Sequence, residues 1–83
     1  MDNTLGYLRE TLSNYTDQYD IGKRIYKKLV GHHYHGEGDF IKVLSQEEIN
    51  FLDRILPDEI HYAKEEQDNE RARQLNEVYE LLF

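Results

Sequence analysis

The chain has 83 residues, a formal net charge of −7 at pH 7, no cysteine and one proline. The lack of cysteine excludes a disulfide framework, a thiolate nucleophile and a cysteine zinc site. The excess of carboxylates argues against nonspecific binding to nucleic acid or an anionic membrane, which needs an excess of Lys and Arg. Hydrophobic residues make up 39% of the chain, which is enough for one thin core layer.

The first predicted helix is indicated by four apolar side chains at spacings of three and four: Leu5, Leu8, Leu12 and Tyr15. Asn3 or Thr4 can cap its N-terminus. Residues 14–17 form a polar interruption. Thr16 or Asp17 is then the expected cap of a second helix.

The second predicted helix carries an apolar face at spacings of four: Ile21, Ile25 and Leu29. Gly31 follows this face and is expected to end the helix in the left-handed conformation that glycine adopts readily. Gly22 lies inside this helix and Gly6 inside the first, and each weakens its helix by up to about 1 kcal/mol relative to alanine. Close packing against a neighbour would explain both.

Residues 32–38 are predicted to form a loop. Residues 39–44 are too few to separate helix from strand by period, and we expect one or two helical turns because a lone strand would have no partner in this sequence. Ser45 and Glu48 then form a capping box that begins another helix. Pro57 removes a backbone donor from that helix, so a kink or turn is expected there, with a kinked but continuous helix as the alternative.

The segment 57–83 is expected to form one long C-terminal helix. Its acidic middle, residues 64–71, holds no large apolar side chain. We interpret this middle as a solvated helical bridge, with a turn at Asp68 and Asn69 as the alternative. The predicted fold is therefore all-α, a small antiparallel helical bundle of about four helices with a long C-terminal helix, in a single domain over residues 1–83.

Both ends of the chain resemble a known family. The matching runs are TLGYLRE at residues 4–10 and LNEVYELL at residues 75–82, with further agreement at residues 51–52 and 66–68. They resemble the sigma-G-dependent sporulation-specific small acid-soluble spore proteins of Bacillus, the CsgA family. The resemblance implies a forespore protein made late in sporulation, without an established activity and unlike the DNA-coating spore proteins.

Three histidines fall within four residues of the predicted loop: His32, His33 and His35. Imidazole is a good ligand for Zn, Ni and Cu(II), so these residues form a candidate metal site. Structural zinc sites, however, usually use separated ligand pairs on rigid elements. The other interpretations are a solvated loop and a pH sensor, because imidazole gains charge near pH 6.5. A metal- or pH-responsive module is therefore the alternative function.

Four basic residues form two columns on the second predicted helix, away from its apolar face: Lys23, Arg24, Lys27 and Lys28. One interpretation is a solvated face that pairs with the acidic residues 58–70. The other is a docking patch for an acidic partner. Nucleic acid is not expected there, because the helix has no groove-reading motif and no interleaved aromatic platform.

The last three residues, Leu81, Leu82 and Phe83, are the second candidate contact site. An apolar end of this kind is costly to expose. It either closes the core of the monomer or contacts a second copy or a partner's groove.

No arrangement of nucleophile and base is visible, so we expect no enzyme activity and no cofactor. The first residues carry no signal-peptide pattern, and no apolar run approaches the roughly 20 residues of a membrane span. We therefore expect a soluble cytoplasmic protein, in the forespore or spore core as the resemblance implies. Its expected function is non-enzymatic, through an unknown protein partner, self-association or accumulation.

Overall fold

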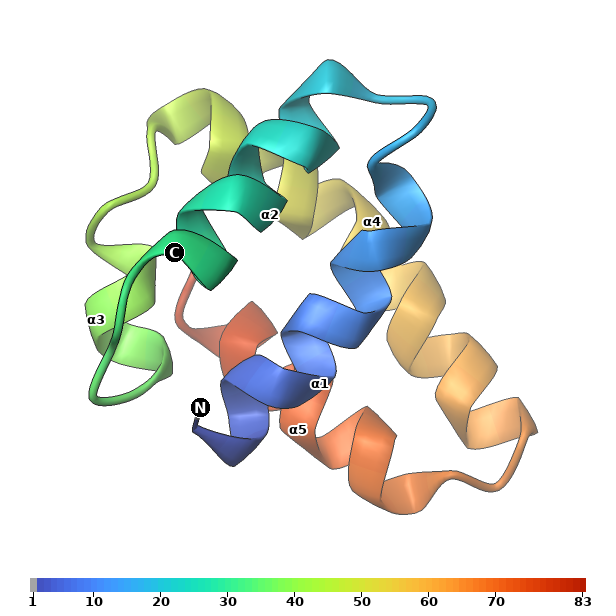
Figure 1. Cartoon of the computed structure of the whole chain (residues 1–83). Helices are drawn as coiled ribbons and strands as arrows, with labels where there is room; N and C mark the ends of the chain where they lie inside the picture. The colour runs from blue at the N-terminus through green and yellow to red at the C-terminus, as the bar shows by residue number, and fades with distance from the viewer. Residues whose placement is uncertain (1) are drawn as a thin grey trace.

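The computed structural model describes residues 2–83, which form five α-helices and one 3₁₀ turn and contain no strand (Figure 1). The all-α class is therefore confirmed. The elements are α1 (Asn3–Leu12), η1 (Ser13–Tyr15), α2 (Asp20–Gly31), α3 (Glu37–Ile41), α4 (Gln46–Glu65) and α5 (Asn69–Glu80). No helix in the described part is long and apolar enough to cross a membrane.

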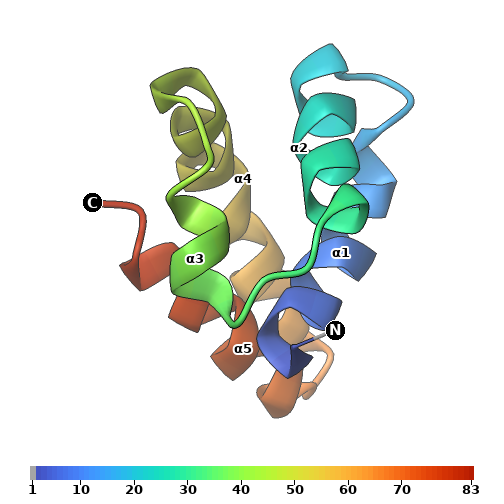
Figure 2. The same cartoon turned by 60° about the vertical axis from the view of Figure 1, so that its left-hand side comes forward.

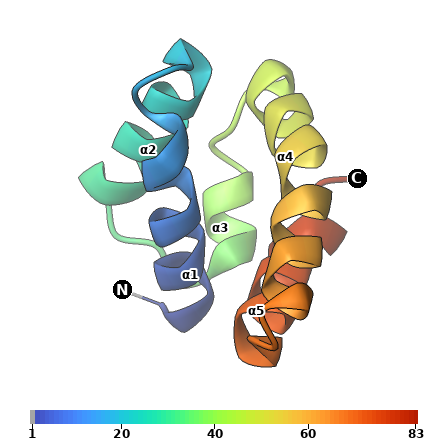
Figure 3. The same ribbon diagram turned by 90° about the vertical axis from the view of Figure 1, so that its right-hand side faces the viewer.

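The helices lie in two halves joined through α3. Figure 3 shows α1 and α2 in one half and α4 and α5 in the other, with α3 between them. Figure 2 shows the chain crossing from α2 to α3. Helix α5 packs against both α4 and α1, so the second half covers the first. One cluster of buried side chains runs through all five helices, and its fully buried members include Leu8, Leu12, Ile25, Leu29, Phe40, Leu52, Leu56, Leu75 and Val78.

The expected caps of the first two helices are wrong. Asp2 caps α1, and its Oδ2 accepts from the amide of Leu5 at 3.3 Å. Helix α2 begins later than expected, at Asp20, because the polar residues after α1 wind into η1. The hydroxyl of Thr16 donates to the carbonyl of Ser13 at 3.2 Å, so it helps to end this turn instead of capping α2.

Close packing explains Gly22 and not Gly6. A Cβ atom at Gly22 would lie 2.3 Å from the carbonyl oxygen of Tyr15, whereas one at Gly6 would meet no atom within 4 Å. The left-handed conformation expected for Gly31 is wrong, because no described glycine has a positive φ. Helix α2 ends instead where His32 becomes extended, and the hydroxyl of Tyr34 donates to the carbonyl of Lys28 at 2.8 Å, which satisfies one terminal acceptor.

Helix α4 runs through Pro57 without a turn. Pro57 is exposed, so the carbonyl that loses its donor can be hydrated. On the side of the helix that faces the core, Leu56, Ile60 and Ala63 are buried in one stripe. Because a turn at Pro57 would break this stripe, the packing keeps the helix continuous. The expected turn is therefore wrong, and the continuity of the alternative, a kinked but continuous helix, is confirmed.

The chain reverses at an elbow between α4 and α5. Gln67 adopts φ 61°, its amide donates to the carbonyl of Lys64 at 3.0 Å, and the amide of Asp68 donates to the carbonyl of Ala63 at 2.8 Å. This pattern is a Schellman motif, with glutamine at the position that usually holds glycine. The Asp68 carboxylate then accepts from the amide of Arg71 at 3.2 Å and caps α5.

The elbow corrects the predicted long C-terminal helix over residues 57–83. The alternative turn at Asp68 and Asn69 is the right interpretation, because α4 ends before Asp68 and α5 begins at Asn69. The Asp68 amide caps the C-terminus of α4, and the Asp68 side chain caps the N-terminus of α5. The break returns α5 to the core, where Leu75 and Val78 are buried.

Candidate functional site

The basic residues of α2 divide into two pairs. Arg24 and Lys28 turn toward α4 and meet one carboxylate, that of Glu48. The Nε of Arg24 donates to Glu48 Oε2 at 2.7 Å, and the Nζ of Lys28 donates to Glu48 Oε1 at 2.7 Å. We call Arg24, Lys28 and Glu48 the Glu48 junction. It links α2 to the first turn of α4.

Glu48 also completes the predicted capping box. Its Oε1 accepts from the amide of Ser45 at 2.8 Å, and the hydroxyl of Ser45 accepts from the amide of Glu48 at 3.2 Å. The Glu48 side chain is 1% exposed. Burial raises the pKa of the Glu48 carboxyl, but the hydrogen bonds from Lys28, Ser45 and Arg24 outweigh it and lower that pKa to about 2. The carboxyl is therefore ionised inside the fold.

The expectation that the basic face pairs with residues 58–70 is wrong. Arg24 and Lys28 pair with Glu47 and Glu48, which lie at the start of α4. The reason is that α2 packs near the N-terminal end of α4 and away from the elbow. Lys23 and Lys27 are exposed on the outer side of α2, and no described residue forms an ion pair with either.

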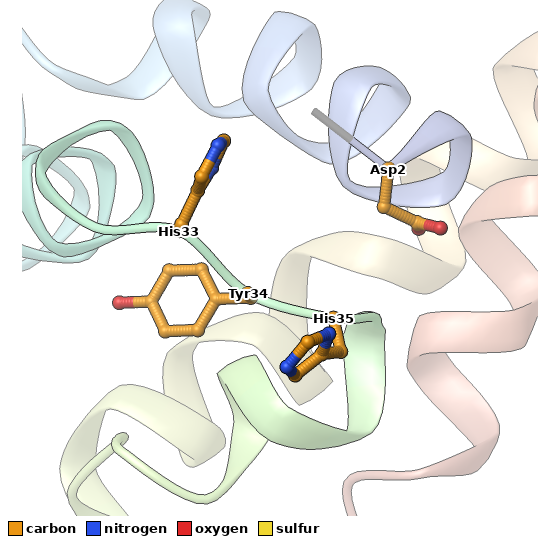
Figure 4. Close-up of a pocket in the computed structure, with 4 residues that line it drawn as sticks. All are labelled: Asp2, His33, Tyr34 and His35. Carbon is orange, nitrogen blue, oxygen red and sulfur yellow. The ribbon is translucent and has the colours of Figure 1, made fainter.

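The three candidate metal ligands, His32, His33 and His35, are exposed in the segment between α2 and α3. Figure 4 shows the His33 and His35 rings on different sides of this segment, with the Asp2 carboxylate turned away from both. Among residues 2–83, no group of three or more His, Cys, Asp or Glu side chains is placed to hold a metal ion. The structure therefore does not bring the three histidines together, and the metal site stays a prediction.

Tyr34 and His33 line two surface hollows beside these histidines. One hollow, of about 330 Å³, is lined by Asp2, His33, Tyr34 and His35. The other, of about 360 Å³, is lined by Lys28, His32, His33, Tyr34 and Val43. The Tyr34 ring contacts that of Phe40 edge to face, at a centroid distance of 5.2 Å. The bond to the Lys28 carbonyl and this contact hold Tyr34 while the histidines point to solvent.

The last three residues differ in their exposure to solvent. Leu82 is buried and closes the core, as one interpretation predicted. Leu81 is about half exposed and Phe83 is 79% exposed, so these two side chains remain available for contact.

One exposed surface escaped the sequence analysis. Asp58 and Tyr62 in the second half of α4 and Glu66, the C-cap of that helix, recur every four residues, and all three are exposed. Only Glu66 lies in the segment 64–71 that was predicted to be a solvated bridge, and Asp58 was considered only as part of the acidic region expected to pair with the basic residues of α2. The neighbouring Glu59 accepts from the hydroxyl of Tyr15 at 2.7 Å, and burial together with this bond raises the pKa of Tyr15.

Comparison with known proteins agrees with the resemblance of the two ends. A Bacillus subtilis (strain 168) protein named "Sigma-G-dependent sporulation-specific SASP protein" is 51% identical over 83 residues, which cover 100% of both chains. No solved structure matches this chain. The CsgA family, described as "Minor curli fiber component A", matches residues 1–83. The chain therefore belongs to the CsgA family.

Proposed function

We propose that this chain is a non-enzymatic spore protein, made in the forespore and retained in the spore core. The observation that carries the proposal is the 51% identity, across the full length of both chains, to a protein named as sporulation-specific and sigma-G-dependent. Identity at this level over the full length of both chains indicates the same fold. The proposed mode of action is protein contact or accumulation of the protein itself.

The two available names point in different directions, and we follow that of the relative. The family description refers to a curli fibre component, whereas the relative's name refers to sporulation. The described residues form helices, which satisfy their backbone hydrogen bonds internally. Fibres of the cross-β kind grow instead by pairing extended strands from many chains. The helical fold therefore supports the sporulation assignment.

The charge inventory gives a physical reason for acid solubility. In dilute acid the 17 Asp and Glu side chains become neutral, the 10 Lys and Arg remain positive and the four His become positive. The chain then carries charge of one sign, and mutual repulsion keeps copies apart. This behaviour fits a protein that is recovered from spores by acid extraction.

Immunoblotting of the native protein tests the proposal. Extracts would be taken in dilute acid from growing cells, sporulating cells and purified spores, together with a matched strain that lacks sigma-G. We expect the protein in sporulating cells and spores, and its loss in the mutant strain. Equal amounts in growing cells would contradict the proposal. The Bacillus subtilis relative, blotted in parallel, serves as the positive control.

The arrangement of the helices is also part of this proposal. A small antiparallel bundle is supported by the elbow at Gln67, which folds α5 back along α4. A solution structure by nuclear magnetic resonance would test the relative directions of α1, α4 and α5.

A further inference from the structure

Helix α2 presents an outer face whose two lysines form no ion pair with any described residue, although the ring of Tyr19 at its end contacts the rings of Tyr15 and Phe51. Lys23 and Lys27 stand one turn apart at its centre. Tyr19, 47% exposed, lies at one end, and Val30, 46% exposed, lies at the other. We call these four residues the basic α2 face. Exposed apolar side chains that flank two lysines are suited to a partner surface that is acidic and partly aromatic.

The second half of α4 presents a surface of that kind. Asp58, Tyr62 and Glu66 follow one another at four-residue intervals, and Tyr62 is 54% exposed. No described residue forms an ion pair with Asp58 or Glu66. We call these three residues the acidic α4 face. Its tyrosine can receive a lysine ammonium on the ring as well as pack against aliphatic carbons.

The two faces match in spacing and in charge. On a helix, four residues span about 6 Å, so both faces place a side chain at nearly the same interval. With the two helices side by side and parallel, Lys23 falls opposite Asp58, and Lys27 falls opposite Tyr62. Glu66 lies one turn further along and is within reach of the long side chain of Lys27.

The flanking charges agree with the same register. Asp20 is exposed one turn before Lys23, and Arg54 is exposed one turn before Asp58. When Lys23 and Asp58 are opposite each other, these two residues also face each other with opposite charge. The alignment therefore pairs Lys23 with Asp58 and Lys27 with Tyr62, and it brings Asp20 near Arg54.

Within one copy, α2 meets α4 at the Glu48 junction, and neither the lysines of the basic α2 face nor the carboxylates of the acidic α4 face form an ion pair with any described residue. We propose that a second copy of this chain docks its acidic α4 face on the basic α2 face of the first. Both copies carry a net charge of −7, but the repulsion between their distant charges is weakened by salt. At physiological ionic strength, charges more than about 8 Å apart are largely screened, so the charges within the two contacting faces determine whether two copies associate.

This inference goes beyond the proposed function, which names no contact surface. It can fail while accumulation in the spore stands, because the two are measured separately. An interface between copies would also not require any other spore component.

Charge reversal of each face tests the contact. One variant carries Lys23→Glu and Lys27→Glu, and the other carries Asp58→Lys and Glu66→Lys. Sedimentation equilibrium at about 0.15 M salt, over protein concentrations up to about 1 mM, gives the association constant of the wild type, of each variant and of their equimolar mixture. We expect the wild type to associate and each variant alone to associate at least about ten-fold more weakly.

The mixture is the decisive sample, because each variant keeps one natural face that fits the other variant. We expect mixing to restore association to within about three-fold of the wild type. A control with Arg9→Glu and Lys42→Glu changes the net charge as the first variant does, but at exposed residues outside both faces, and should associate like the wild type. A wild type that stays monomeric at every concentration would overturn the proposal. So would a mixture that does not recover, and so would a control that loses association as the variants do.

Discussion

The Glu48 junction and the histidine segment place ionisable side chains in opposite ways. At the junction, Arg24 and Lys28 come from one helix and Glu48 from another, some 20 residues later in the chain, yet their charged groups converge on one buried point. His32 and His35 are nearly adjacent in sequence, yet they point to solvent and do not converge. The contrast shows that helix packing, and not spacing along the chain, brings chemical groups together.

The largest expected effect comes from neutralising the junction. Glu48→Gln leaves Arg24 and Lys28 without their shared carboxylate at a buried site. Removing this carboxylate costs about 3 kcal/mol, at the low end for a buried pair because the two cations that remain are partly exposed and can be hydrated, and the loss is measurable by urea denaturation followed by circular dichroism. Glu47→Gln is the matched control, because its exposed pair with Arg24 contributes less than about 1 kcal/mol. Equal losses in the two variants would show that burial does not distinguish them.

Acid gives the next effect and requires no mutation. The pKa of Glu48 falls from 4.5 to about 2 on folding, so the native state binds fewer protons than the unfolded state. Its contribution of about 3 kcal/mol is present above pH 4.5 and is lost as the pH falls through 2. Urea unfolding at pH 7, 4 and 2 should show the loss between the last two values. In Glu48→Gln this part of the pH dependence should disappear.

Gly22→Ala tests whether the junction depends on the position of α2. Its Cβ would lie 2.3 Å from a backbone oxygen of Tyr15, so α2 must shift. Overpacking of this kind costs about 1–3 kcal/mol in the free energy of unfolding. Gly6→Ala, in open space inside α1, should instead stabilise the protein by up to about 1 kcal/mol. A stable Gly22→Ala variant would mean that the helix adjusts freely.

The smallest effect is expected in the histidine segment. In metal-free buffer, joint replacement of His32, His33 and His35 by glutamine should change the free energy of unfolding by less than about 0.5 kcal/mol, because all three are exposed. The same variant tests the metal prediction. If the segment binds zinc, added zinc will raise the melting temperature of the wild type and not of the variant. A rise in both would place the metal elsewhere, for example near His61.

The sequence predicted correctly those features that depend on residues a few positions apart. The spacing of Leu5, Leu8 and Leu12 predicted the buried face of α1, and Ser45 with Glu48 predicted the capping box, since both depend on contacts within a few residues. The ion pairs of Glu48 could not be predicted, because they require the packing of α2 on α4. Glu48 therefore looked like a surface cap, although it is a buried charge.

The two errors in α4 and α5 share a cause. Local rules favoured a kink or turn at Pro57 and continuity at Gln67, whereas α4 continues through Pro57 and the chain turns at Gln67. Burial of Ile60 and Ala63 outweighs the lost hydrogen bond at Pro57. At the elbow, glutamine adopts a left-handed conformation at a cost of about 1–2 kcal/mol, which the burial of α5 offsets. Tertiary packing decided both cases, and local sequence does not encode it.

The pairing of α1 with α5 has a consequence for the timing of folding. Thr4 donates to Gln74 at 2.5 Å and Arg71 donates to Glu10 at 2.7 Å, contacts between segments some 60–70 residues apart. The apolar stripe of α1 is thus synthesised first, and α5, which covers it, is synthesised after the other helices. A chain still growing on the ribosome has no α5 with which to shield that stripe, so stable folding must await the last of these helices. A nascent chain that stalls before α5 would be left with an open core and exposed to proteases.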